Sequence, residues 1–194
     1  MTIFDQIIEA QELLGKSREH AQSLKEKELF LLAIDALWFV WRNGQSHEFE
    51  SYRKDVESKA PDRVIATFNT RDEAYSWLGI EPKPSDLAYV LIADEYHVIM
   101  TSRDGKRSSL VPHPALELHI EEMMRDGLPP AAAIFNTREE ADTWFDSQAE
   151  PPVQTVIQIG GERYLAVYYR NINHRAIYPF SIARRLEKKE GPGE

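Results

Sequence analysis

One seven-residue stretch occurs twice in the chain, and this recurrence restricts the fold more than any other feature. Phe68-Asn69-Thr70-Arg71-Asp72-Glu73-Ala74 returns as Phe135-Asn136-Thr137-Arg138-Glu139-Glu140-Ala141, at an offset of 135 − 68 = 67 residues. At the same offset Trp77 aligns with Trp144, Pro84 with Pro151, Glu95 with Glu162 and Pro112 with Pro179. Self-similarity at a fixed period indicates a duplicated supersecondary unit. The chain is therefore predicted to contain a tandem repeat.

Each copy of the repeat is predicted to contain the same elements in the same order. Hydrophobic periodicity and turn residues indicate a helix, a strand, a second helix and then three strands joined by short turns. In the first copy these are a helix from Ser46, strand 64–68, a helix capped by Thr70, and strands 87–92, 96–102 and 107–111. In the second copy they are helix 115–126, strand 131–135, a helix capped by Thr137, and strands 153–159, 163–169 and 174–178.

This order of elements predicts an α+β fold with mostly antiparallel sheets, because hairpin-connected strands pair antiparallel. Four segments are expected: an N-terminal helical segment over 1–44, repeat units over 45–111 and 112–180, and a charged C-terminal tail over 181–194. The strand order, and whether the two units share one sheet, do not follow from the sequence.

The repeated motif itself has a structural interpretation. Thr70 with Glu73, and Thr137 with Glu140, match the capping box, in which threonine accepts from a backbone N–H of the first helical turn and glutamate reaches back. The alternative is a repeated ligand-binding corner at a helix N-terminus. Carboxylates at that position repel the anions that helix N-termini bind, so the capping interpretation is favoured.

The N-terminal segment contains the most hydrophobic stretch of the chain. An amphipathic helix is predicted over residues 3–14, and the run from Leu29 to Trp41 is apolar nearly all round, interrupted by Asp35. A helix that is apolar on every side is normally covered by protein on several sides. We therefore predict a central core helix here, with Asp35 on a helix face or bound to a partner group.

Charge and composition exclude several classes of function. With 23 basic and 32 acidic residues, the net charge of −9 disfavours binding to a phosphate backbone, so no nucleic-acid partner is predicted. The 194 residues include no cysteine, which excludes disulfides and thiolate sites. The N-terminus does not resemble a signal peptide, and no apolar run is long enough to cross a bilayer. The expected protein is cytoplasmic, with no membrane association.

No motif for catalysis is present. The sequence lacks a zinc-protease motif, a phosphate-binding loop, a dinucleotide fingerprint and a nucleophile elbow. His113, Glu117 and His119 could in principle hold a metal, but surface histidines at the start of a helix are the simpler interpretation. No catalytic residue, metal site or cofactor is predicted, and the chain is expected not to be an enzyme.

The segment between Tyr164 and Tyr178 is the best candidate for a binding site. It combines aromatic side chains with planar hydrogen-bond donors around one hairpin, a composition typical of protein interfaces. The alternative is an exposed strand face in which tyrosines pack on arginine stems. The residues assigned to the predicted site are Tyr164, Tyr168, Arg170, Asn173, His174, Arg175 and Tyr178.

The acidic, cysteine-free chain and its repeated F-N-T-R-[DE]-E-A-x-x-W stretch resemble bacterial toxin-immunity proteins, within an uncharacterised tandem-repeat group. The resemblance implies a protein-binding module whose partner is a basic toxin domain, with acidic helices steering association. It identifies no functional residue. Two alternatives are a small-molecule sensor or enzyme with a pocket between the two repeat units, and a scaffold whose strand edges pair with other copies. The oligomeric state is not predicted.

Overall fold

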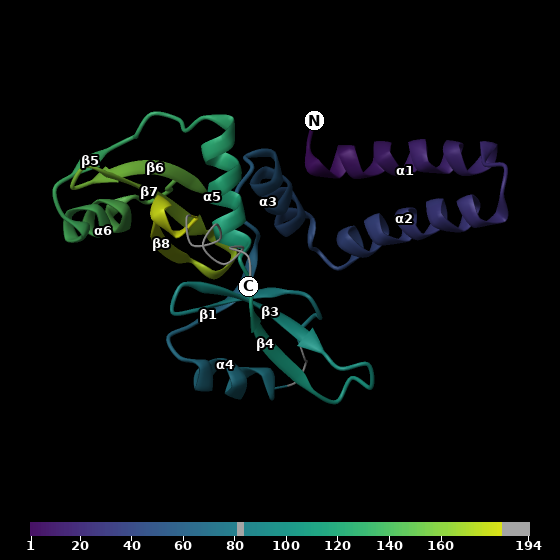
Figure 1. Cartoon of the computed structure of the whole chain (residues 1–194). Coiled ribbons are helices and arrows are strands. Elements are labelled where there is room, and N and C mark those ends of the chain that lie inside the picture. The colour runs from purple at the N-terminus through teal and green to yellow at the C-terminus, as the bar shows by residue number, and fades with distance from the viewer. Residues whose placement is uncertain (81–83, 184–194) are drawn as a thin grey trace, which may run out of the picture. The chain divides into compact units, whose positions relative to one another are not determined.

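The computed structural model describes residues 1–80 and 84–183 (Figure 1). The chain divides into two compact units, Met1–Lys59 and Ala60–Glu194. The boundary follows the helix that was predicted to open the first repeat unit, so the strands of both copies belong to the second compact unit. Most of the predicted charged tail over 181–194 lies outside the described residues.

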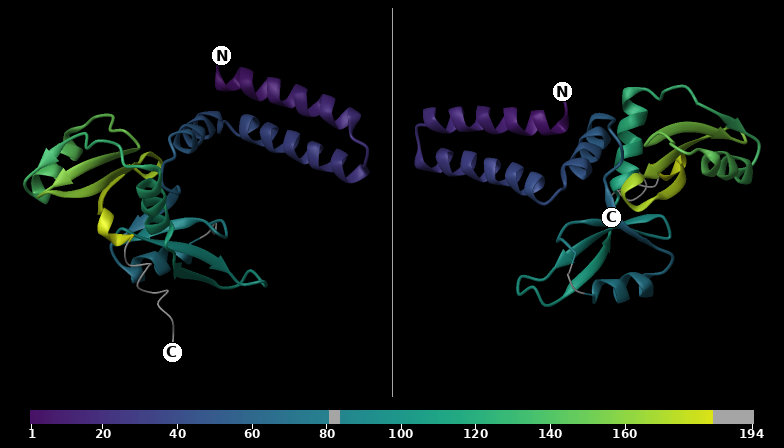
Figure 2. Two further views of the ribbon diagram at one scale, coloured as in Figure 1. Left: turned by 45° about the horizontal axis from the view of Figure 1, so that its top comes forward. Right: turned by 180° about the vertical axis from the view of Figure 1, so that it is seen from behind.

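The first unit consists of three helices: α1 (Ile3–His20), α2 (Leu24–Arg42) and α3 (Ser46–Glu57). Thr2 and Ser23 each form a capping box, with Asp5 and Glu26 respectively. These caps satisfy backbone N–H groups that have no partner within the helix. Figures 1 and 2 show α1 and α2 side by side and antiparallel. No helix in the described part of the chain is both long and apolar enough to cross a membrane.

The prediction of a central core helix over 29–41 is wrong. No residue of α2 is buried, although the helix forms over the expected range. One side of α2 packs on α1, where the rings of Trp41 and Phe4 lie 5.3 Å apart. On other sides Leu32 and Phe39 remain 66% and 61% exposed. Hydrophobic composition thus identified a helix that requires cover, but the described residues cover only one of its sides.

The second unit contains two sheets with one short helix after the first strand of each. The first sheet is formed by β1 (Val64–Phe68), β2 (Tyr89–Ile92), β3 (Glu95–Thr101) and β4 (Ser108–Pro112), with α4 (Arg71–Leu78) after β1. The second sheet is formed by β5 (Ile134–Phe135), β6 (Gln154–Ile159), β7 (Glu162–Tyr169) and β8 (His174–Pro179), with α6 (Arg138–Ser147) after β5. Helix α5 (Ala115–Asp126) precedes the second sheet, and the short 3-10 helices η1 (Arg170–Ile172) and η2 (Phe180–Ile182) flank β8.

The two sheets have the same topology. Their strand orders are β1-β2-β3-β4 and β5-β6-β7-β8, and in each sheet the first pair is parallel and the other two are antiparallel. The register is also repeated, since Phe68 pairs with Ile92 and Phe135 pairs with Ile159. The predicted α+β class is confirmed, with each sheet mixed.

The strand predicted over 131–135 is reduced to two residues. Ala132 and Ala133 still exchange backbone hydrogen bonds with Val156 and Gln158, at 2.8 and 3.0 Å. Pro129 and Pro130, directly before Ala131, have no N–H to donate, so a regular ladder cannot extend back beyond residue 131. The second sheet therefore has a very short edge strand.

The two copies of the repeat share a hydrophobic core. Helices α4 and α6 each cover one face of their own sheet, over separate clusters that contain Ala74 and Ala141. The opposite faces contribute to a single third cluster together with α5. That cluster includes Val64, Leu91, Tyr96, Leu116, Ile120, Val156, Leu165, Val167, Tyr169 and Tyr178. Because buried residues from both sheets pack in one cluster, the copies are not independent domains.

The repeated motif forms the predicted helix caps. Thr70 accepts from the N–H of Glu73 at 3.3 Å, and Glu73 accepts in return from the N–H of Thr70 at 3.2 Å. In α6 the side chain of Thr137 accepts from the N–H of Glu140 at 3.2 Å. Glu140 reaches one residue further back than a capping box requires, to the N–H of Asn136 at 2.8 Å. Glu73 likewise accepts from the N–H of Asn69, at 2.9 Å. The capping interpretation of the motif is therefore confirmed: α4 has the full capping box, and in α6 the side chain of Thr137 is the cap.

These caps give a testable stability prediction. Thr70→Ala and Thr137→Ala are each expected to lower the free energy of unfolding by about 1 kcal/mol, because each leaves a helix N–H without its acceptor. Urea unfolding followed by circular dichroism measures the change. Thr143→Ala is the matched control, since its hydroxyl only donates to the carbonyl of Glu139 within α6, a bond that slightly disfavours the helix. If Thr143→Ala lowered the free energy of unfolding as much as Thr137→Ala, the capping explanation would be contradicted.

Candidate functional site

The predicted hairpin site is divided between the two faces of the second sheet. Side chains alternate along a strand, so Tyr164, Tyr168 and Arg175 lie on the face that α6 covers. Tyr178 lies on the opposite face, buried in the shared core. The seven predicted residues therefore do not form one continuous surface.

Arg175 joins β8 to the C-terminal end of α6. Its guanidinium donates to the carbonyl of Gln148 at 2.9 Å and lies 4.9 Å from the ring centroid of Tyr168. The ring of Phe145 is 5.9 Å away on another side. A cation at the last carbonyls of a helix is favoured by the helix dipole. These contacts give Arg175 a structural role that its sequence position alone does not show.

Two residues of the turn between β7 and β8 connect the second sheet to the first. Asn171 donates from its side-chain amide to the carbonyl of Val64 at 2.6 Å. His174 Nε2 lies 2.8 Å from a carboxylate oxygen of Asp94, in the turn between β2 and β3. That turn has positive φ at both Ala93 and Asp94, as a two-residue hairpin requires. Asn171 and His174, two of the polar residues in this turn, thus help to join the two copies of the repeat.

A chain of buried tyrosine hydroxyls also crosses between the sheets. The hydroxyl of Tyr96 donates to the carbonyl of Asp62 at 2.7 Å and lies 3.1 Å from the hydroxyl of Tyr169. Tyr169 in turn lies 3.2 Å from the hydroxyl of Tyr178. Burial raises the pKa of all three phenols well above their ordinary value, because a phenolate would be poorly solvated there. This neutral network lies in the core that the two copies share.

The remaining predicted residues lie on the exposed turn. Arg170 is exposed in η1, and Asn173 adopts a left-handed conformation with φ of 48°. Asparagine tolerates this conformation, as expected from the sequence. The side-chain oxygen of Asn173 accepts from the hydroxyl of Tyr168 at 3.0 Å. Among the seven residues, Arg170 is thus the side chain best placed to meet a partner.

A wide hollow lies beside α6, at the repeated motif for which a ligand-binding corner was the less favoured alternative. Its volume is about 750 Å³, and its walls combine aromatic rings, carboxylates and hydroxyls. The lining residues are Phe135, Thr137, Glu139, Glu140, Thr143, Trp144 and Ser147. Phe135 and Trp144 are half-buried, with ring centroids 5.3 Å apart, while Glu139 is exposed in the first turn. The hollow therefore presents an aromatic floor beside negative charge.

The first copy builds the same aromatic pair from the same motif. The ring centroids of Phe68 and Trp77 are 5.3 Å apart, with an interplanar angle of 51° against 49° in the second copy. The copies differ at the motif arginine. Arg71 donates to the carbonyl of Leu110 in β4, whereas Arg138 pairs with Asp142 on its own helix. The tryptophan at the end of the repeated stretch was the sequence signal for this feature, which capping alone does not explain.

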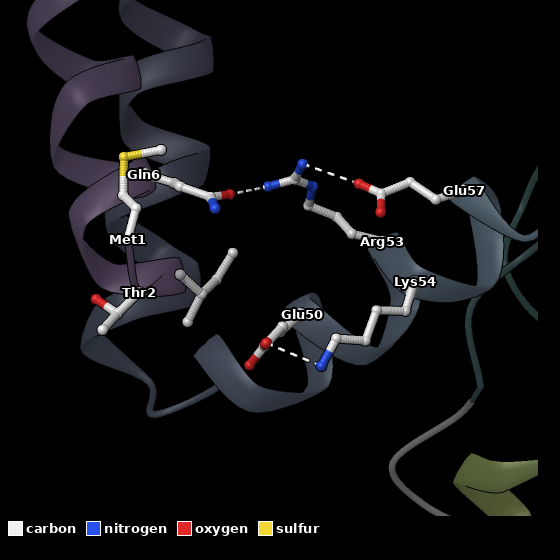
Figure 3. A pocket seen from close by; sticks show the side chains of 8 residues that line it. Met1, Thr2, Gln6, Glu50, Arg53, Lys54 and Glu57 are labelled. Atoms are coloured by element: carbon white, nitrogen blue, oxygen red, sulfur yellow. Dashed lines mark hydrogen bonds and ion pairs between the residues drawn. The ribbon is translucent and has the colours of Figure 1, made fainter.

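A second hollow, of about 330 Å³, lies within the first unit between α1 and α3 (Figure 3). The side chains of Arg53 and Lys54 are both engaged, because Arg53 binds Gln6 and Glu57 while Lys54 pairs with Glu50 at 2.9 Å. The hydrogen bond and charge of Lys54 lower the pKa of Glu50.

The described residues contain no cluster of three or more histidine, aspartate or glutamate side chains that could hold a metal ion. His119 instead bonds to the side chain of Gln154 at 2.9 Å, and His113 lies 5.0 Å from the ring of Tyr89. Both histidines therefore make contacts within the fold.

No protein-family model matches the chain, and comparisons with curated proteins and with solved structures find no significant match.

Proposed function

We propose that the chain is a non-catalytic protein-binding module, and that the hollow beside α6 receives a basic segment of its partner. The observation that carries the proposal is the combination of Trp144 and Phe135 with exposed carboxylates around one open hollow. A lysine or arginine side chain fits this chemistry, because its cation is attracted both by an aromatic face and by a carboxylate.

The charge of the whole chain supports a basic partner. A net charge of −9 attracts a positively charged protein over a distance of about one Debye length, roughly 10 Å at ordinary salt concentration. A toxin domain of the kind that immunity proteins neutralise is one such partner, and a cytoplasmic immunity protein is the specific form of this proposal. Small-molecule sites bury most of the surface of their ligand, so an open hollow is better suited to a protruding side chain of a protein.

The proposal predicts which variant loses the partner. The tagged chain is used to capture proteins from its source cells, and also the product of the adjacent gene. We expect a basic protein bound at a fixed stoichiometry. Glu139→Lys with Trp144→Ala should weaken the complex at least about a hundredfold, because an aromatic anchor and an attractive charge are lost together. Isothermal titration calorimetry measures the change.

The first copy supplies the matched control. Asp72→Lys with Trp77→Ala alters the equivalent residues of α4 and is expected to leave affinity within about threefold of wild type. Arg170→Ala tests whether the exposed turn contributes as well. Failure to capture a protein, or an equal loss in both double variants, would contradict the proposed site.

A further inference from the structure

An exposed apolar stripe runs along α2 on the side that α1 does not cover. It consists of Leu29, Leu32, Ala36 and Phe39, all exposed, with fractional exposures of 55%, 66% and 61% for the leucines and the phenylalanine. Their spacing, in steps of three, four and three residues, is the a/d spacing of a coiled coil. We name these four residues the exposed stripe.

The exposed stripe lies opposite the face of α2 that packs on α1. The half-buried residues Phe30, Ile34, Leu37 and Trp41 form their own row at three- and four-residue steps. With about 100° of rotation per residue, the two rows lie roughly 150° apart around the helix. Helix α2 is thus built to contact a helix on each of two opposite sides, and α1 supplies only one of them.

The exposed stripe is self-complementary in an antiparallel arrangement. Its outer pair, Leu29 and Phe39, and its inner pair, Leu32 and Ala36, are both centred on residue 34. A two-fold axis at that point places Leu29 against Phe39 of a second copy and Leu32 against Ala36. Each contact then occurs twice, as in every interface related by a two-fold axis. Each layer also pairs a larger side chain with a smaller one.

The charges beside the exposed stripe favour the same arrangement. Glu28, Asp35 and Arg42 are exposed at seven-residue intervals along one edge. An antiparallel second copy brings Glu28 of each chain next to Arg42 of the other, giving two opposite-charge pairs. A parallel copy would instead place these residues beside the edge that carries Ala33 and Val40. Antiparallel packing also aligns the helix dipoles favourably.

We propose that the exposed stripe of α2 is the interface of an antiparallel homodimer, in which α2 of one copy packs against α2 of a second copy. The two-fold axis also brings the two Asp35 carboxylates together. Their repulsion weakens the dimer at neutral pH, so association is expected to be reversible and dependent on concentration. This inference does not depend on the proposed partner of α6.

Sedimentation velocity of the full chain, from low micromolar to submillimolar concentration, tests the proposal. The mass is expected to rise from the 22.4 kDa of one chain towards twice that value. Leu32→Glu should weaken the dimer at least about a hundredfold, because it buries an unpaired carboxylate in the interface. Leu13→Glu on α1 is the matched control, since Leu13 is 65% exposed but lies outside the stripe, and it should leave the dimer intact.

Charge exchange then tests the antiparallel orientation. Glu28→Arg and Arg42→Glu should each weaken the dimer about tenfold, since each creates two like-charge pairs. The double variant should recover most of the affinity, because the opposite-charge pairs are restored with their signs reversed. Arg42 also lies over the ring of Trp38, at 4.9 Å, so its single variant could weaken α2 itself. Recovery in the double variant distinguishes this effect from loss of pairing.

Asp35→Asn should tighten the dimer about threefold by removing the repulsion at the axis. The proposal is overturned if the wild-type chain stays monomeric throughout, or if Leu13→Glu and Leu32→Glu act equally. Additive losses in the double charge variant would exclude the antiparallel pairing. A monomer that binds phosphatidylcholine vesicles through α2 would assign the stripe to a lipid surface instead, and would likewise overturn the proposal.

Discussion

Phe145→Ala is expected to lower the free energy of unfolding of the second unit by about 3–5 kcal/mol. The phenylalanine is 1% exposed at the centre of the cluster beneath α6, where its ring stacks near Trp144 with centroids 6.1 Å apart. The substitution removes this ring and leaves a cavity that the two-layer packing cannot fill. A domain has only about 5–15 kcal/mol of stability, so the loss is a large part of the total.

The repeat supplies the matched variant for this experiment. Leu78 occupies the equivalent position in α4 at 6% exposure, and Leu78→Ala should cost about 2–5 kcal/mol. Because the sheets share a core, each variant is expected to reduce amide protection in both β3 and β7. Hydrogen exchange read by mass spectrometry resolves the two strands. Loss of protection confined to the altered copy would show that the copies unfold separately.

Stability of the second unit is expected to fall steeply in alkaline solution. Burial raises the folded-state pKa of Tyr96, Tyr169 and Tyr178 above the unfolded value near 10.0. Their neutral hydroxyls therefore contribute stability that is fully present below about pH 10 and is lost as the pH rises towards the folded-state values. In that pH range each group lowers the free energy of unfolding by about 1.4 kcal/mol per pH unit, so the three together lower it by about 4 kcal/mol per pH unit.

Guanidinium unfolding at a series of pH values between about 9 and 12 measures this slope, and tyrosinate absorption reports the ionisation. Tyr169→Phe should reduce the slope by about one third, since one of three groups no longer titrates. Tyr52→Phe is the control, because Tyr52 is 47% exposed in the first unit. A normal titration of all eight tyrosines in the folded protein would contradict the buried network.

Local features were predictable from the sequence because their causes are local. The caps at Thr70 and Thr137 depend on residues three and four positions away, and the turns at Ala93-Asp94 and Gly160-Gly161 depend on positive φ at two adjacent residues. The duplicated unit was visible because duplication copies every such signal at one offset. These signals were sufficient for the order of elements and for the α+β class.

The candidate sites depend on contacts between residues far apart in the chain, which the sequence alone does not show. Arginine and histidine are common in binding surfaces, yet Arg175 and His174 contact residues of the same fold. Their partners are Gln148 and Asp94, which lie 27 and 80 positions away in the sequence. The hollow beside α6 exists because the motif tryptophan folds over the preceding strand, and the capping pattern does not encode this. The hydrophobicity of residues 29–41 correctly predicted helix α2, but hydrophobicity does not show which surface, if any, covers each apolar face.

The duplicated unit, the helices and their caps, the hairpin turns and the α+β class follow from the sequence. Each of these depends on side-chain periodicity and backbone preferences within a few residues. The tertiary structure decided that both sheets share a core through Tyr96, Tyr169 and Tyr178, and that α2 keeps an exposed stripe. Burial is a property of which surfaces meet, and residues far apart in the chain determine that.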